Sequence, residues 1–224
     1  MPQRANRFWT IFLTIVLVDV ATKRFAVSEL TPPYIPHDVI GDFLRFTLAY
    51  NPGGAMSLSL GPSSRWWFTL LAIATLFVLA WMYKQTSPND RFQIASIALI
   101  CGGAVGNLLD RLRSARGVVD FIDIGVGTHR FWTFNVADMG VTIGTAMLTW
   151  ILCVRASGEE RRAQGIPTTG ALDEPNYSSF WPKIAMLELC PGFTFLSGYI
   201  KCTAWFTAVA ASPNPVAISF SFPG

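Results

Sequence analysis

The sequence predicts an all-α polytopic membrane protein, a four-transmembrane-helix bundle with a small β element outside the membrane. Of the 224 residues, 51% are hydrophobic and only 14% are charged, whereas soluble proteins carry about 25% charged residues. The chain also contains long runs without a charged residue, which are typical of helices that cross a bilayer. Seventeen Phe and eight Trp suit the aromatic belts at the two membrane interfaces.

Four apolar runs are the candidate membrane spans. They cover about residues 8–26, 66–83, 92–109 and 132–154. The second and third contain no charged residue and approach the roughly 20 residues that a helix needs to cross the hydrocarbon. The first is the weakest by hydropathy, because Asp19, Lys23 and Arg24 lie in its second half. It has no small-residue cleavage site, so we interpret it as a retained span and not as a signal peptide.

Two longer connections join these spans. The segment 27–65 is rich in Pro and Gly, and the alternation in 43–48 predicts short strands in a hairpin or a three-stranded patch. The segment 110–130 is expected to be a polar connection. Four spans place both connections on one side of the membrane, opposite both termini. The candidate polar residues then share one membrane face: Asp19, Asn51, Asn107, Asp110, Arg111, Asp120 and Asp138.

The chain is expected to form a membrane-embedded domain, residues 1–155, and a C-terminal extension, residues 156–224, to which we assign no role. A fifth span within 184–211 is disfavoured, because Glu188, Pro191 and Lys201 interrupt it and such residues are costly in hydrocarbon. Lys and Arg are nearly balanced between the loops of the two faces, so loop charge does not decide the orientation.

Several kinds of function are disfavoured. A net charge of +3 without a basic run gives no sign of nucleic-acid binding. The four cysteines are scattered, and with His37 and His129 as the only histidines the sequence predicts no metal site. No GxSxG motif is present, and neither histidine has a regular spacing to a serine, which disfavours a serine hydrolase.

Asp120 and Asp138 are the candidate catalytic residues. Ionisable groups at the edges of membrane spans are costly, which makes them functional candidates. Two carboxyl groups held close together cannot both ionise cheaply, so one keeps a proton. Such a pair can deprotonate a water for attack on a peptide carbonyl while the acid partner protonates the carbonyl oxygen and later the leaving amine. The alternative is that each aspartate caps a helix or forms a structural ion pair.

Other polar residues suit supporting roles. Three amides beside apolar runs can bind an extended backbone, orient an aspartate or cap a helix: Asn51, Asn107 and Asn135. Arg111 can pair with Asp110, hold a phosphate or extend to lipid headgroups. Asp19 and Lys23 are four residues apart on one helix face, a spacing that predicts an ion pair.

Five blocks, in order, resemble the signature blocks of the bacterial lipoprotein signal peptidases (signal peptidase II). They are Asp19-x-x-Thr22-Lys23, Asn51-x-Gly53-x-Ala55, Gly103-Ala104-x-Gly106-Asn107-x-x-Asp110-Arg111, Val119-Asp120-Phe121 and Phe134-Asn135-x-Ala137-Asp138. The resemblance covers about residues 8–155. Five ordered blocks are far more specific than any single motif.

The resemblance implies an aspartic endopeptidase of the bacterial inner (cytoplasmic) membrane, with cytoplasmic termini and the active site toward the extracytoplasmic face. Its implied substrate is a prolipoprotein whose lipobox cysteine carries diacylglycerol, cut on the N-terminal side of that cysteine. The segment 27–65 becomes an extracytoplasmic β-containing element that cradles the substrate. The resemblance implies no metal and no organic cofactor. We expect a monomer surrounded by membrane lipid.

By motif match, Asp120 and Asp138 are the implied catalytic dyad of a peptidase domain, residues 1–155. The residues implied to line or support the site are Asn51, Gly53, Asn107, Arg111, Asn135 and Ala137. Asp19 and Lys23 are implied to be structural or near-site positions.

The chain departs from the family pattern in two places. The family has an aromatic residue where Met56 stands and an alanine where Gly54 stands, so this loop is expected to be looser. The segment after about residue 165 has no counterpart in the family. Two other functions remain open: a small transporter or channel that uses Asp19, Asp120 and Asp138 as an ion relay, and an inactive module that binds lipidated proteins.

Overall fold

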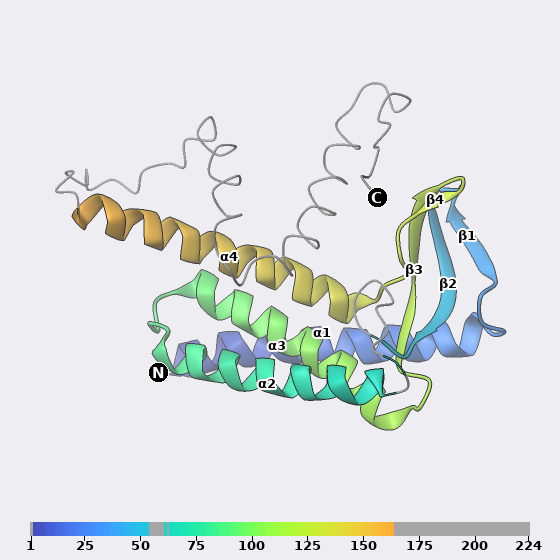
Figure 1. Cartoon of the computed structure of the whole chain (residues 1–224), viewed down its shortest axis with the longest axis horizontal. Helices are drawn as coiled ribbons and strands as arrows, with labels where there is room; N and C mark the ends of the chain where they lie inside the picture. The colour runs from blue at the N-terminus through green and yellow to red at the C-terminus, as the bar shows by residue number, and fades with distance from the viewer. Residues whose placement is uncertain (1, 54–60, 62, 164–224) are drawn as a thin grey trace, which may run out of the picture. The chain divides into compact units, whose positions relative to one another are not determined.

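The computed structural model describes residues 2–53, 61 and 63–163. Gly54, Met56 and the extension beyond Ala163 lie outside the described residues. The chain divides into two units, Met1–Gly158 and Glu159–Gly224, and the described elements lie in the first unit except for the end of the last helix. In chain order they are α1 (Pro2–Glu29), β1 (Pro36–Ile40), β2 (Leu44–Asn51), α2 (Ser64–Gln85), α3 (Arg91–Arg113), β3 (Val118–Val126), β4 (His129–Arg130) and α4 (Val136–Ala163) (Figure 1).

Three helices are long and apolar enough to cross a membrane, which confirms three of the four expected spans. They are α2, α3 and the part Val136–Arg155 of α4. The first expected span also forms a helix, α1, which has 28 residues. Its charged residues keep it from being identified as a span by composition. The protein is therefore a mostly helical membrane protein with a small antiparallel sheet.

Several helix boundaries differ from the expected spans, and two of them lie beside the candidate site residues. α4 begins at Val136 and not near residue 132. The Oδ1 atom of Asn135 accepts a hydrogen bond from the Asp138 amide at 2.9 Å, as the N-cap residue of a helix does. α3 continues to Arg113, beyond the expected end at 109. Asp110 and Arg111, in its last turn, find partners inside the protein, so the helix can continue past them.

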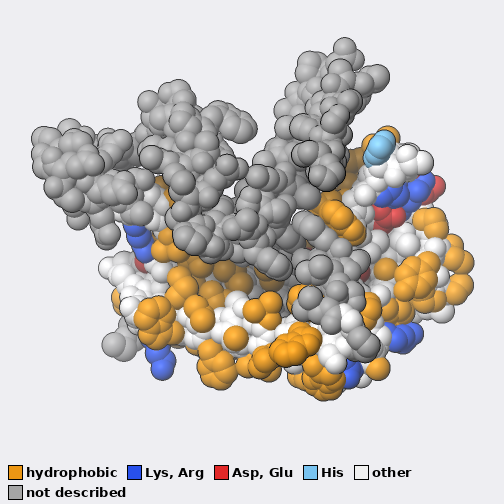
Figure 2. All heavy atoms as spheres, viewed as in Figure 1, with side chains coloured by type: hydrophobic (Ala, Val, Ile, Leu, Met, Phe, Trp, Pro, Cys, Tyr) orange, Lys and Arg blue, Asp and Glu red, His pale blue; other side chains and the backbone are white. Residues whose placement is uncertain are grey.

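The helices differ in how much of their apolar surface the protein covers. In the apolar stretch of α3 that could cross a membrane, 61% is buried inside the protein. In the corresponding stretch of α2, 11% is buried. Large side chains of α2 such as Leu70, Phe77 and Trp81 are exposed. Figure 2 shows hydrophobic side chains along the helices, while charged side chains gather at their ends and at the sheet. Because so large an apolar surface is unfavourable in water, α2 is a lipid-facing helix and α3 is the central one.

Glycines allow α3 and α4 to pack closely, because they carry no side chain that would separate the two backbones. A Cβ at Gly103 would overlap the carbonyl oxygen of Ala137, and one at Gly144 would lie 2.8 Å from the Ser96 carbonyl oxygen. On the other side of α3, a Cβ at Gly102 would lie 3.0 Å from the Ile15 Cβ of α1. The glycines therefore set the spacing of three helices.

Substituting Gly103 by valine should destabilise the protein. The new side chain would have to push α4 away at Ala137, and overpacking of this kind costs about 1–3 kcal/mol. We expect a lower midpoint of denaturant unfolding in detergent. The matched control is Ala74→Val on the exposed face of α2, which should leave the midpoint unchanged. Equal midpoints for the two variants would contradict the packing role of Gly103.

The sheet is antiparallel, with strand order β1-β2-β3-β4. Pairing of β2 with β3 confirms that the two long connections lie together, as the span count predicts. β1 and β2 form the hairpin expected within 27–65. β3 and β4 extend it to four strands, so 110–130 is more than a polar connection. The reason is the apolar part of β3, since Val119 and Phe121 pack with Leu48 of β2 against Ala26 of α1.

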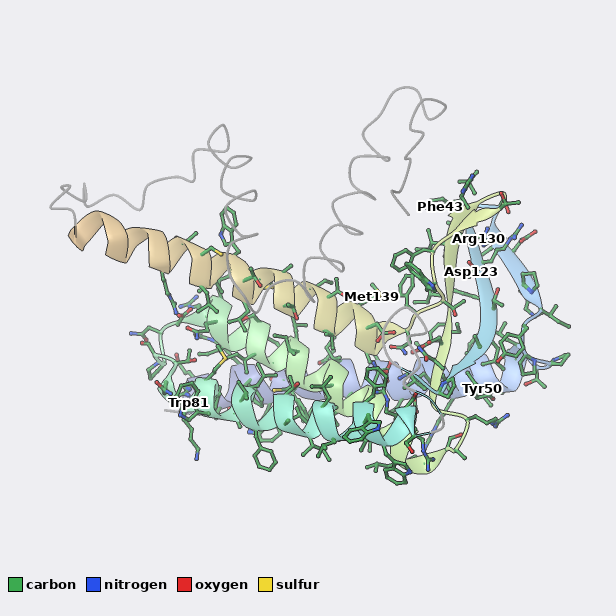
Figure 3. The ribbon with its side chains drawn as sticks, viewed as in Figure 1. Phe43, Tyr50, Trp81, Asp123, Arg130 and Met139 are labelled. Carbon is green, nitrogen blue, oxygen red and sulfur yellow. The ribbon has the colours of Figure 1, made fainter. Side chains whose placement is uncertain are left out.

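The two ends of the sheet differ in character. Figure 3 shows Phe43 and Arg130 toward one end and Tyr50 at the end beside the helices. Arg130 pairs with Asp123 at 2.7 Å, in the half of the sheet farther from the helices. At the helix end, Ala49 lies opposite Asp120 in the β2–β3 register. The sheet thus places the carboxyl group of Asp120 beside the ends of the helices.

Candidate active site

Asp120 is a buried residue of β3, with only 3% of its surface exposed. Its Oδ1 accepts a hydrogen bond from Asn135 Nδ2 at 2.6 Å, and its Oδ2 accepts one from Asn51 Nδ2 at 3.3 Å. Asn51 ends the neighbouring strand β2. Two segments far apart in the sequence therefore orient the same carboxyl group.

Asp138 lies in the first turn of α4, where a carboxylate also interacts favourably with the helix dipole. Its Oδ1 accepts a hydrogen bond from Asn107 Nδ2 of α3 at 2.7 Å. Its Oδ2 accepts one from the backbone amide of Asn135 at 3.2 Å. Asp138 as a residue is less buried than Asp120.

Two amides connect the aspartates. Asn135 Nδ2 donates to Asp120 and also to Asn107 Oδ1 at 3.2 Å, while Asn107 Nδ2 donates to Asp138. The structure thus brings Asp120 and Asp138 into one hydrogen-bond network. Each of the three asparagines donates a hydrogen bond to an aspartate, which is one of the arrangements that the sequence allows, and Asn135 caps α4 as well.

A buried lysine lies behind this network. Lys23 Nζ pairs with Asp19 Oδ2 at 2.8 Å, which confirms the expected ion pair, and with Asp110 Oδ2 at 2.9 Å. It also donates to Asn107 Oδ1 at 3.0 Å. Asp19 and Lys23 are 0% and 4% exposed, so these two charges of α1 are paired within the protein and do not face lipid.

Arg111 holds the loop that follows β2. One of its terminal nitrogens donates to the carbonyl oxygen of Gly53 at 3.2 Å, and the other to that of Asn107 at 3.3 Å. The Gly53 amide in turn donates to Asn51 Oδ1 at 3.0 Å. Among the described residues, the ion-pair partner of Asp110 is Lys23 and not Arg111. Arg111 therefore supports the segment that positions Asn51.

Ala137 lies where α1, α3 and α4 meet. It is fully buried, and its amide donates to Asp19 Oδ1 at 2.8 Å. A Cβ at Gly106 would lie 2.6 Å from Asp19 Oδ2 and 3.1 Å from the Ala137 Cβ. Larger side chains at either position would separate Asp19 from the start of α4.

The environment of Asp120 favours its neutral form. Burial, followed by the negative charge of Asp138, raises the pKa of Asp120 to about 7, although hydrogen bonds from Asn135 and Asn51 act in the opposite direction. A carboxyl group with this pKa can hold a proton near neutral pH and release it during a reaction.

The sequence predicts Asp110 only as a possible partner of Arg111. Asp110 holds both Lys23 and the Val119 amide, which donates to Asp110 Oδ2 at 3.2 Å. The signal was present in the sequence, because Gly103, Asn107 and Asp110 are spaced by four and three residues and therefore share one helix face.

The fold and this site define a membrane enzyme with two aspartates, joined by amides, at one end of its helices. A family model described as signal peptidase (SPase) II matches residues 11–154. The chain belongs to this family, whose members are proteases.

Relatives and solved structures agree with this assignment. A lipoprotein signal peptidase of Polynucleobacter necessarius is 36% identical over 161 residues, which cover 71% of this chain and 92% of that protein. One from Pseudomonas putida is 39% identical over 139 residues, or 61% of this chain and 80% of that protein. A bacterial membrane enzyme solved at 2.3 Å has a TM-score of 0.60 and 30% identity, covering 67% of this chain and 90% of that one.

Proposed function

We propose that Asp120 and Asp138 form the catalytic dyad of an aspartic endopeptidase that removes signal peptides from diacylglyceryl-modified prolipoproteins. The observation that carries the proposal is the hydrogen-bonded chain from Asp120 through Asn135 and Asn107 to Asp138. It holds two carboxyl groups from different elements in one place. The pKa of Asp120, raised to about 7, supports a shared proton.

The reaction follows from one neutral and one ionised carboxyl group. The ionised aspartate takes a proton from water, and the resulting hydroxide attacks the peptide carbonyl carbon, while the neutral aspartate protonates the carbonyl oxygen. Collapse of the tetrahedral intermediate breaks the C–N bond. The amine leaves with the proton first taken from water, and a hydroxyl proton of the intermediate restores the neutral aspartate.

The other residues of the proposed site keep the dyad and the substrate in place. Asn51, Asn107 and Asn135 orient the two carboxyl groups, and Arg111 with Gly53 holds the loop after β2. Ala137 provides the close approach of α4 to α1 and α3. We propose that the enzyme is a monomer.

The proposal includes α1 as a fourth membrane span. A helix of 28 residues is about 42 Å long at 1.5 Å per residue, enough to cross a bilayer. Exposed apolar side chains, Trp9, Leu13, Leu17 and Phe25, run along its length. Its buried charges, Asp19 and Lys23, pair inside the protein, so they do not prevent insertion. Four spans place the site and the sheet on one face, which we propose is the extracytoplasmic face of the inner membrane.

The substrate specificity belongs to the same proposal. The site lies at the ends of membrane helices, so a signal peptide that is itself an apolar helix can approach it through the bilayer. A diacylglyceryl group on the cysteine beside the scissile bond would remain in lipid. We propose cleavage on the N-terminal side of this cysteine.

The test is cleavage of a purified prolipoprotein, with and without the diacylglyceryl group, by the protein in proteoliposomes. We expect hydrolysis of the lipidated precursor only, and mass spectrometry should show a product that begins with the lipidated cysteine. Binding without hydrolysis, or proton flux without hydrolysis, would overturn the proposed activity. Equal cleavage of the unmodified precursor would overturn the specificity.

The rate should fall on the alkaline side of neutrality. Asp120 must keep its proton, so we expect kcat/KM to decrease about tenfold per pH unit above about pH 7. For stability, the raised pKa means that the folded protein binds this proton more tightly than the unfolded chain. The stabilisation that protonated Asp120 gives the folded state is therefore complete below the unfolded pKa of about 4, and it is lost as the pH rises to about 7.

Initial rates across about pH 5–9 check this prediction. Asp123→Asn is the matched control, because Asp123 lies on the same strand but pairs with Arg130 outside the dyad. The control should keep the alkaline decline. A profile that stays flat to about pH 9 would contradict the role of Asp120 as proton holder.

A further inference from the structure

We propose that Lys23 is a positioning residue that decides which aspartate is ionised, by fixing the orientation of the Asn107 amide. The inference rests on the proposed function and deepens it. Lys23 donates to Asn107 Oδ1 at 3.0 Å, and Asn107 Nδ2 donates to Asp138 at 2.7 Å. Lys23 therefore reaches the dyad through one side chain.

The direction follows from hydrogen-bonding chemistry. A lysine ammonium has only donors, so the atom of Asn107 that faces it must be the oxygen. The NH₂ group of Asn107 then points to Asp138 and favours its ionised form, because an ionised carboxylate is purely an acceptor. With the amide turned over, its oxygen would face Asp138 and would suit only a protonated Asp138.

Lys23 is the stronger of the two groups that hold the Asn107 oxygen. The other is Asn135 Nδ2, at 3.2 Å. That NH₂ group also donates to Asp120 at 2.6 Å and to the Val119 carbonyl oxygen at 3.2 Å. Its two hydrogens are shared among three acceptors, whereas Lys23 brings a full charge. Without Lys23, the orientation of Asn107 would be weakly determined.

The position of Lys23 is itself fixed. It is 4% exposed and lies between two carboxylates, Asp19 on its own helix and Asp110 on α3. The charged groups that act on Asp138 are Lys23 of α1, Arg111 of α3 and Asp120 of β3. Asp19 of α1 and Asp110 of α3 are the ion-pair partners of Lys23. Of the groups that act on Asp138, Lys23 contacts the side-chain oxygen of the asparagine whose NH₂ group donates to Asp138.

A simple Lys23→Met substitution would leave two buried carboxylates unpaired and could prevent folding. The informative variant is therefore Asp19→Asn/Lys23→Met/Asp110→Asn. It preserves side-chain shapes and keeps oxygens for the Ala137 and Val119 amides. It removes two negative charges and one positive charge, so no buried charge is left without a partner.

The triple variant removes both the charge of Lys23, which acts on Asp138 directly, and the donor to Asn107. Either loss would move the acidic limb of kcat/KM to higher pH, so the Asn107→Ala background is needed to separate positioning from charge. We expect an upward shift of about one pH unit, equivalent to about 1.4 kcal/mol. Lys84→Met, at an exposed position in the last turn of α2, is the control and should cause no shift.

A double-mutant cycle with Asn107→Ala tests the route. If Lys23 acts through Asn107, the triple substitution should cause no further shift in the Asn107→Ala background. The carboxyl stretch in infrared difference spectra reports the same titration where turnover is too slow. A downward shift, no shift, or an equal shift without Asn107 would overturn the inference. Failure of the wild-type protein to cleave the precursor would overturn the proposed function instead.

Discussion

Asp138→Asn should lower kcat for cleavage of the lipidated precursor by at least about 10³-fold. General acid–base catalysis contributes about 10²–10⁴-fold, and Asp138 would supply the base that activates water. An amide cannot take the proton, and it cannot share one with Asp120. The same argument gives a loss of similar size for Asp120→Asn, because the proton for the carbonyl oxygen is then missing.

The fold should survive these substitutions. In Asp138→Asn the new side chain keeps an oxygen that can accept from the Asn135 amide, and the repulsion between two acidic groups is removed. We expect an unfolding midpoint in detergent equal to or above that of the wild type, together with unchanged binding of the precursor. The double substitution should lower kcat little more than either single substitution does, since the two residues act as a unit. Residual activity near the wild-type level in either variant would rule out the dyad.

Asp19→Ala should have the largest effect on stability. The substitution removes one of two carboxylates paired with Lys23, and it removes the acceptor for the Ala137 amide at the start of α4. Breaking a buried ion pair costs about 3–5 kcal/mol, and we expect about 3 kcal/mol because Asp110 remains beside Lys23. The measurement is denaturant unfolding in detergent, with helix content as the signal.

Two other variants define the cause of this loss. Asp19→Asn keeps an acceptor for Ala137 and should lose less stability than Asp19→Ala. Asp38→Ala removes an exposed partner of Arg45 in the sheet and should change the free energy of unfolding by less than about 1 kcal/mol. If Asp19→Ala unfolds at the same denaturant concentration as the wild type, the ion pair does not stabilise α1 against α3 and α4.

The fold was predictable wherever one local pattern carried the information. The spans now seen as α2, α3 and the apolar part of α4 follow from runs that avoid charge, since hydrocarbon excludes charge from any helix that faces it. Strands within 27–65 were predictable from alternation. β3 was not, because it is only partly apolar and becomes a strand by pairing with β2.

The sequence predicts which residues belong to the candidate site better than it predicts which of them contact one another. Asp120, Asp138 and the three asparagines stand out because polar groups beside apolar runs are costly. Their partners do not follow from the sequence. Asp110 pairs with Lys23 of a distant helix and not with its neighbour Arg111, because side chains of adjacent helix residues point in different directions.

The charge-free runs thus determined the membrane character, and the ordered sequence blocks determined the family and the identity of the candidate dyad. Those properties depend on composition and on residues at particular positions along the chain. Only the tertiary structure decided that one lysine contacts Asp19, Asp110 and Asn107, and that two amides join Asp120 to Asp138. Hydrogen bonds depend on distances of about 3 Å between atoms of different elements. Those distances are set by how α1, α3, α4 and the sheet pack together.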